Sequence, residues 1–217
     1  MKTIVLLLLA VLFFSYSAYC QTVYKLPYAG KDNRVELTVS NTSTLSAEGV
    51  NITVGSCPTW IKMKEVEEAI GEISSNKEET FAFNFDVEKT APTGEEGTIS
   101  FIITSSNKES WTKEIKVEAS APDKYELFQN YPNPYNPTTR ISYQLPLDSR
   151  VTIEIYDILG REVSTLVNNE EKKAGYYENN FCANGLSSGV YIYRLTAKSK
   201  SGAPKEYDSI KKMMLIK

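Results

Sequence analysis

Few residue types in this chain could take part in catalysis, and the absence of histidine is the most informative feature. The sequence contains no histidine, which removes the commonest general base, the usual serine and cysteine triads and most catalytic zinc sites. Cys57 therefore lacks the partner that normally activates a thiol nucleophile. Carboxylate pairs could still act as acid and base, as in glycosidases. The candidate carboxylates are Glu65, Glu67, Glu68, Glu78, Glu79, Glu95 and Glu96.

These carboxylates lie in polar stretches that are typical of solvated loops. A carboxylic acid that donates a proton in catalysis needs a partly buried environment that raises its pKa. We therefore predict that the chain is not an enzyme and uses no cofactor. No series of acids such as D-x-D-x-D-G is present, so we predict no metal site.

The large aromatic residues suggest a second kind of chemistry, the binding of sugar rings. Trp60 and Trp111, with Tyr24 and Tyr28, could form a flat aromatic surface for a glycan. Large aromatic side chains more often belong to hydrophobic cores. We therefore expect both tryptophans to be buried and keep them as candidate ligand-binding residues.

Charge and cysteine content restrict the partners. The chain has 24 basic and 27 acidic residues, a formal charge of -3, and no long run of like charge, so no nucleic-acid partner is expected. Cys57 and Cys182 fall in different halves of the chain. A disulfide between them would have to join two modules, so two separate thiols, buried as small apolar residues, are favoured.

The N-terminus has the pattern of a signal peptide over residues 1–20. Lys2 precedes an apolar run over residues 4–14 that is shorter than the roughly 20 residues of a membrane span. Cleavage after Cys20 would leave Gln21 first, and cleavage after Ala18 is the alternative. Acylation of Cys20 is disfavoured because bulky Tyr19 precedes it, where a lipobox has a small residue.

The remaining residues divide into two modules, separated by a break in composition. Residues 120–125 are polar and contain a proline, which predicts a linker between a module at residues 21–119 and another at residues 126–217. Both modules consist of short segments in which apolar and polar residues alternate, separated by turn residues. We predict an all-β protein with two tandem immunoglobulin-like antiparallel β-sandwiches.

One segment of the first module departs from this alternation. Val66, Ala69, Ile70 and Ile73 have helical spacing, so the segment is either a short helix or an irregular strand. In the order and spacing of NRVELTVSNTS, CPTWI and APTGEEGTISFIIT, residues 23–119 loosely resemble immunoglobulin-like modules that bacteria append to glycosidases and surface proteins. That resemblance implies a fold and no particular activity.

The second module opens with the segment YPNPYNP at residues 131–137. Proline fixes its own backbone angle and keeps the preceding residue out of the helical region, so we expect an ordered, extended entry segment whose tyrosines could lie across the sandwich. Taken alone, the segment would be interpreted as an ordinary proline-rich linker, and the strands that follow it decide against that alternative. Further on, Asp157 can bind backbone amides and Gly160 can adopt a positive φ, which predicts a tight turn at residues 157–161.

The final strand is predicted at residues 207–216. Its four apolar residues, 213–216, are consecutive, which suits a strand with both faces at least partly covered. Lys211, Lys212 and Lys217 flank them. These lysines either keep an edge strand from pairing with other chains or belong to a recognised signal.

Residues 126–217 as an ordered series resemble the type A C-terminal sorting domain of the bacterial type IX secretion system, also called the Por secretion system. This family is related to the immunoglobulin-like domain of flagellar hook-capping proteins. The residues that carry the resemblance are Pro132, Asn133, Pro134, Asn136, Pro137, Asp157, Gly160, Arg161, Gly189, Tyr191, Lys212 and Lys217.

The resemblance implies partners and a destination. It implies export by the type IX secretion machinery, via the periplasm, to the outer surface or the medium of a Gram-negative bacterium. It also implies processing by a sortase-like protein and attachment to surface lipopolysaccharide or release. We expect the first module to be a non-enzymatic structural or adhesive cargo. The alternatives are a carbohydrate-binding accessory module and a subunit of an extracellular filament or layer that binds copies of itself.

Overall fold

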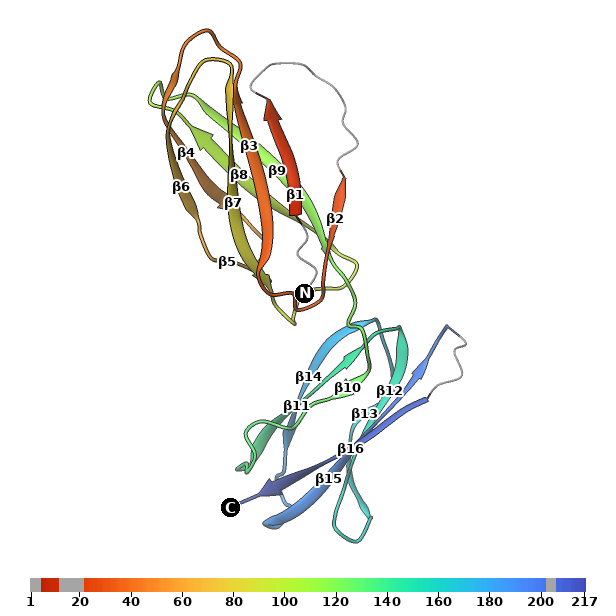
Figure 1. The fold of residues 1–217 in the computed structure, drawn as a ribbon. Coiled ribbons are helices and arrows are strands. Elements are labelled where there is room, and N and C mark those ends of the chain that lie inside the picture. The colour runs from red at the N-terminus through yellow and green to blue at the C-terminus, as the bar shows by residue number, and fades with distance from the viewer. Residues whose placement is uncertain (1–4, 12–21, 202–205) are drawn as a thin grey trace. The chain divides into compact units, whose positions relative to one another are not determined.

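The computed structural model describes residues 5–11, 22–201 and 206–217, and these residues form strands and no helix (Figure 1). The chain divides into two compact units, residues 1–120 and 121–217. Each unit contains its own sheets and hydrophobic core, which confirms the predicted all-β sandwich fold. The predicted signal-peptide cleavage site at Cys20 and Gln21 lies outside the described residues.

The first unit is built from two sheets, in the orders β1-β3-β7-β5 and β2-β9-β8-β4-β6. Neighbouring strands are antiparallel except for two parallel pairs, β1 with β3 and β2 with β9. The strands are β1 Val5–Val11, β2 Val23–Leu26, β3 Asn33–Asn41, β4 Ala47–Ser56, β5 Ile61–Met63, β6 Glu67–Ile73, β7 Lys77–Val87, β8 Glu96–Thr104 and β9 Ser110–Ala119.

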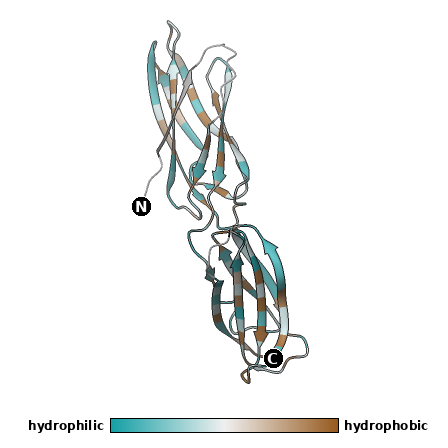
Figure 2. Ribbon diagram, turned by 90° about the vertical axis from the view of Figure 1, so that its right-hand side faces the viewer, coloured by the Kyte–Doolittle hydropathy of each residue, from teal (hydrophilic) through white to brown (hydrophobic). Residues whose placement is uncertain are grey.

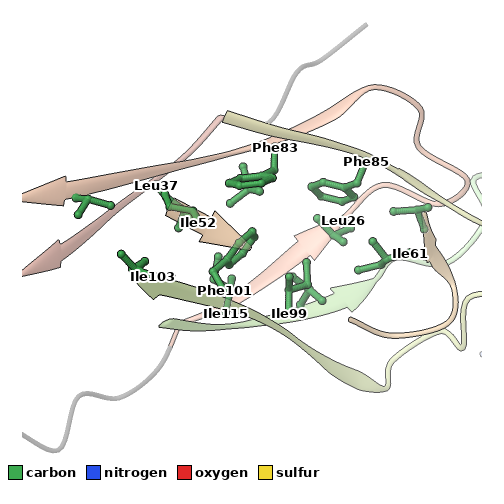
Figure 3. Close-up of a cluster of buried hydrophobic side chains, with 14 of the residues drawn as sticks. Leu26, Leu37, Ile52, Ile61, Phe83, Phe85, Ile99, Phe101, Ile103 and Ile115 are labelled. Carbon is green, nitrogen blue, oxygen red and sulfur yellow. The ribbon is translucent and has the colours of Figure 1, made fainter. Parts of the chain in front are cut away.

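Alternation along these strands explains the core of the first unit. Hydrophobic and hydrophilic residues follow one another along the strands (Figure 2), so each sheet presents one apolar face. Phe83 of β7 and Phe101 of β8 come from opposite sheets, and their ring centroids lie 5.1 Å apart (Figure 3). The labelled aliphatic side chains, such as Leu37 and Ile52, fill the space around them. The two sheets therefore pack face to face.

The segment with helical spacing is an irregular strand. Residues 67–73 form β6 at the edge of the five-stranded sheet, and the pairing with β4 shifts register twice. Gly71 has a φ of 82°, which a bulged strand tolerates at glycine. Ile73 is buried at the end of β6, whereas Ala69 on the strand and Val66 just before it are exposed.

The second unit also has two sheets, in the orders β10-β11-β14 and β13-β12-β15-β16. All of their pairings are antiparallel. The strands are β10 Glu126–Leu127, β11 Thr138–Leu145, β12 Ser149–Tyr156, β13 Glu162–Lys172, β14 Gly175–Cys182, β15 Gly189–Ser199 and β16 Glu206–Leu215.

The core of the second unit follows the predicted alternation closely. Three sets of alternating residues are buried, one each from β11, β12 and β15. The sets are Ile141, Tyr143 and Leu145; Val151, Ile153 and Ile155; and Tyr191, Tyr193 and Leu195. Met213 and Leu215 of β16 complete this core from the edge of the four-stranded sheet.

Candidate functional site

The entry segment of the second unit is fixed to the core by one tyrosine. The Tyr193 hydroxyl donates to the Phe128 carbonyl at 2.8 Å and accepts from the Asn130 backbone N–H at 2.8 Å. Burial raises the pKa of Tyr193 to about 12, so its hydroxyl is protonated and can donate at neutral pH. The Asn130 side chain donates to the Pro132 carbonyl at 3.0 Å and to Thr139 Oγ1 at 2.9 Å. The entry segment therefore has one defined path.

This segment also closes the outer edge of the C-terminal part of β16. The Tyr135 N–H donates to the Met214 carbonyl at 2.9 Å, and the Ile216 N–H donates to the Tyr135 carbonyl at 3.0 Å. Asn133 Oδ1 accepts from the Met214 N–H at 2.9 Å. These bonds join the YPNPYNP segment to the last residues of the chain, although about eighty positions separate them. The two predicted motifs form one structural unit.

The two tyrosines of the entry segment have different environments. Tyr135 is buried in the core, while Tyr131 is 74% exposed. Of the two, only Tyr135 therefore packs into the sandwich. Pro132 and Pro134 follow cis peptide bonds, and the Pro137 carbonyl accepts from the Ala183 N–H at 2.9 Å.

The turn between β12 and β13 has the predicted chemistry. Asp157 Oδ1 accepts from the backbone N–H groups of Leu159 at 2.9 Å and Arg161 at 3.0 Å, and Oδ2 accepts from Arg161 Nε at 2.7 Å. Gly160 has a φ of 77°. Ile158 and Leu159 at the tip are more than 70% exposed. The carboxylate therefore fixes a turn that presents two apolar side chains to solvent.

This turn should open in acid. The Arg161 backbone N–H, its side chain and the Leu159 N–H lower the pKa of Asp157. A lowered folded-state pKa gives a stabilisation that is present above the unfolded pKa of about 3.9 and is lost as the pH falls through the folded value. We expect the protection of the Leu159 and Arg161 amides, relative to their intrinsic exchange rates at each pH, to be lost only below about pH 4, measured by NMR hydrogen exchange. Asp157→Asn should remove this pH dependence, and opening with a midpoint near pH 6 would contradict the assignment.

The Gly189-Val190-Tyr191 motif is the pairing partner of the last strand. Gly189 lies opposite Leu215, Val190 opposite Met214 and Tyr191 opposite Met213. Tyr191 is buried, and its hydroxyl donates to the Ser187 carbonyl at 2.8 Å. The motif therefore positions the final strand, and Tyr191 itself is not accessible to a partner.

The outward side of the last strand is partly open to solvent. Met214 is 44% exposed and Ile216 is 49% exposed, while Met213 and Leu215 are buried, so the outward face of this strand is partly covered, as predicted, and its inward face fully. With the cross-strand neighbour Val190, also exposed, and with Lys212, they form what we call the terminal surface. Across the described residues, no ion pair is found for Lys211, Lys212 or Lys217. The terminal surface is thus apolar and cationic.

Sequence reasoning missed Val190, Met214 and Ile216 as surface residues. Period two along β15 could have found Val190, because Tyr191 and Tyr193 point into the core and their neighbours must point outward. The same argument applies to Met214 between buried Met213 and Leu215. The consecutive apolar run concealed this alternation.

The candidate residues of the first unit do not form one site. Trp60 is buried and Trp111 packs partly buried against the same core, so neither side chain forms a flat exposed surface. Contrary to the loop prediction, several candidate acids lie on strands, among them Glu67 on β6, Glu78 on β7 and Glu96 on β8. Glu67 and Glu68 are neighbours on β6, as are Glu78 and Glu79 on β7, so the two side chains of each pair point to opposite faces of a sheet.

Both cysteines that the structure describes are free. Cys57 is partly buried and lies against the core of the first unit, whereas Cys182 is exposed on β14. The expectation of two buried thiols is therefore wrong for Cys182. Among residues 5–11, 22–201 and 206–217, no group of three or more Cys, Asp or Glu side chains is arranged to hold a metal ion. The same residues include no helix with the length and hydropathy of a membrane span.

Comparison with known families identifies the second unit. Residues 129–206 match the model of a family described as "Secretion system C-terminal sorting domain". The match includes the entry segment, the Asp157 turn and the Gly189-Val190-Tyr191 motif, and it confirms the predicted resemblance. No curated protein matches the chain.

Solved structures give only partial similarities. Dimeric latent PorU from Porphyromonas gingivalis is 13% identical with a TM-score of 0.36, and the match covers 92% of this chain but only 19% of PorU. The secreted serine protease VesC from Vibrio cholerae is 10% identical with a TM-score of 0.33, covering 75% of this chain and 46% of VesC. The E. coli chaperone DraB is 14% identical with a TM-score of 0.28, and the match covers 88% of this chain and 95% of DraB. All three scores are too low to support a shared activity.

Proposed function

We propose, from the premise that the second unit is a C-terminal sorting domain of the type IX secretion system, that the chain is a non-enzymatic protein carrying a small β-sandwich as cargo. A domain of this family implies interaction with the type IX machinery and export toward the cell surface or the medium. The family match over residues 129–206 carries the proposal. The cargo would be the first unit, in a structural or adhesive role.

The proposed route has three steps. A signal peptide at residues 1–20 takes the chain to the periplasm, and cleavage leaves Gln21 first. The type IX machinery then recognises the folded sorting domain. A sortase-like protein processes the chain near residue 125 and attaches the cargo to surface lipopolysaccharide or releases it.

We assign recognition to the terminal surface formed by Val190, Lys212, Met214 and Ile216. A contiguous group of exposed apolar side chains bordered by polar or charged residues is typical of a protein interaction site. The motif residues behind this surface, Tyr135 and Tyr191, are buried and hold the last strand in place. A partner that recognises the domain would therefore contact the terminal surface. The buried motif residues would act indirectly, by holding the last strand in position.

An export assay with matched variants tests this assignment. In a host with a working type IX system, the wild-type chain should appear outside the cells, and in a host without that system it should remain in the periplasm. The triple variant Val190→Ser, Met214→Ser and Ile216→Ser should reduce export at least about tenfold, because a few apolar anchors dominate most interfaces. Its thermal unfolding should change little, because these side chains are exposed.

The first unit provides the control. Leu45 and Val66 are exposed apolar residues there, and Leu45→Ser with Val66→Ser should leave export unchanged. Equal export of the triple variant and the wild type would refute the terminal surface as the recognised site. Secretion in the host that lacks the type IX system would refute the proposed route. The intact mass of exported protein then shows whether the chain ends near residue 125 or at Lys217.

A further inference from the structure

The first sandwich has one sheet edge that is covered only by the predicted signal peptide. Strand β1, with the apolar sequence VLLLLAV, pairs in parallel with β3 from Val5 opposite Arg34 to Val11 opposite Ser40. Figure 1 shows β1 beside β3. Because β1 is the end strand of its sheet, removal of residues 1–20 would make β3 the edge.

The backbone groups that would become free can be identified from β7. The Asn84 N–H donates to Glu65 Oε2 at 2.9 Å, and its carbonyl accepts from the Lys64 N–H at 2.8 Å, both on the side of β7 that faces away from β3. Asn84 is therefore opposite Arg34 in a non-hydrogen-bonded pair. The backbone N–H and carbonyl of Arg34 must therefore point toward β1. Because these groups alternate in direction along a strand, those of Glu36, Thr38 and Ser40 point the same way.

The uncovered β3 edge lacks most of the usual devices that prevent strands from pairing, and its two charged residues, Arg34 and Glu36, form an ion pair with each other. Proteins protect edges with short strands, bulges, prolines or several charges. The other edge strands of the first unit have such protection. Strands β2 and β5 are short, and β6 is bulged and carries three glutamates. By contrast, β3 is nine residues long, has no proline, and pairs with β7 without a register shift.

We propose that removal of the leader converts β3 into a dimerisation edge, and that a second copy of the chain covers it by antiparallel pairing of β3 with β3. This inference rests on the processing step of the proposed function. Signal-peptide cleavage uncovers the same edge in every copy, so pairing two like edges about a two-fold axis closes both at once.

The sequence of β3 fits such self-pairing. A two-fold axis at Leu37 brings all nine residues into register, with Arg34 opposite the second copy's Ser40 and Glu36 opposite its Thr38. No like charges then face each other, which would destabilise a cross-strand pair. The same register joins the three strands β3, β7 and β5 that remain in each processed copy into one continuous sheet across the axis.

The oligomeric state of the processed chain tests the proposal. Residues 21–217, purified under reducing conditions so that exposed Cys182 cannot form an intermolecular disulfide, should sediment as a concentration-dependent dimer. Glu36→Pro removes an outward N–H in both copies and should weaken dimerisation about 100-fold. Glu36→Ala keeps that N–H and should dimerise like the wild type. The fluorescence of Trp60 and Trp111 verifies that each variant is folded.

A second pair of variants tests the register. Ser40→Arg places a cation opposite the second copy's Arg34 and should weaken the dimer, whereas Ser40→Glu places an anion there and should not. A chain that stays monomeric at every concentration, or a dimer that is indifferent to both Glu36→Pro and Ser40→Arg, would overturn the proposal. Because purified protein is used, these outcomes are independent of the export assay, which tests the proposed function alone.

Discussion

Tyr193→Ala is expected to destabilise the sorting domain by about 3–5 kcal/mol, the usual cost of truncating a large buried aromatic side chain. Tyr193 is fully buried in the core of the second unit. Its hydroxyl also holds both Phe128 and Asn130. The variant therefore loses packing in the core together with the two hydrogen bonds that fix the start of the entry segment.

Conservative variants separate these two contributions. Tyr193→Phe keeps the ring but leaves the buried Asn130 N–H without its partner, which should cost about 1–3 kcal/mol. Tyr143→Phe is the matched control, because the buried Tyr143 hydroxyl has no hydrogen-bond partner among the described residues, and it should cost much less. Equal losses for the two phenylalanine variants would contradict the anchoring role of Tyr193.

The two units can be followed separately in one chain. Both tryptophans of the sequence, Trp60 and Trp111, lie in the first unit. Urea unfolding measured by tryptophan fluorescence therefore reports the first unit. Hydrogen exchange of residues 121–217 reports the second unit. The Tyr193 variants should speed hydrogen exchange in residues 121–217. They should leave the urea midpoint measured by tryptophan fluorescence unchanged.

The strands could be predicted because side chains alternate between the two faces of a sheet along each strand. Where a strand has one buried face, alternation in the sequence reads out that face directly, as at Ile141, Tyr143 and Leu145. The turn at Asp157 could also be predicted, since its hydrogen bonds are local. Such features need no knowledge of distant parts of the chain.

What could not be predicted depends on long-range contacts. The helical spacing of Val66, Ala69, Ile70 and Ile73 does not correspond to one buried face, because these residues lie on or beside a bulged edge strand in which only Ile73 is fully buried. The bonds of Asn133 and Tyr135 to the last strand join residues about eighty positions apart. Neither segment has a sequence pattern that predicts a contact with the other. The bonds that close the edge of β16 could therefore be recognised only in the structure.

Deletion of the last five residues, Met213 to Lys217, should have the largest effect on the second unit. It removes the buried side chains of Met213 and Leu215 and the backbone bonds that Met214 and Ile216 make with Tyr135. Losing two buried apolar residues costs about 2–5 kcal/mol each. The sum is comparable with the whole stability of a typical domain, about 5–15 kcal/mol. Hydrogen exchange should show residues 121–212 unfolded, with the tryptophan transition of the first unit unchanged.

This expectation determines how export data on the last strand should be interpreted. A truncated chain would fail to be exported through unfolding alone, whatever surface the machinery contacts. Deletion of Lys217 only is the matched control, because this residue adds one hydrogen bond, from its backbone N–H to Ser188 Oγ, and no buried side chain. It should leave the domain folded. If the five-residue deletion also left residues 121–212 protected, the last strand would be dispensable for folding, and any export defect would then report recognition directly.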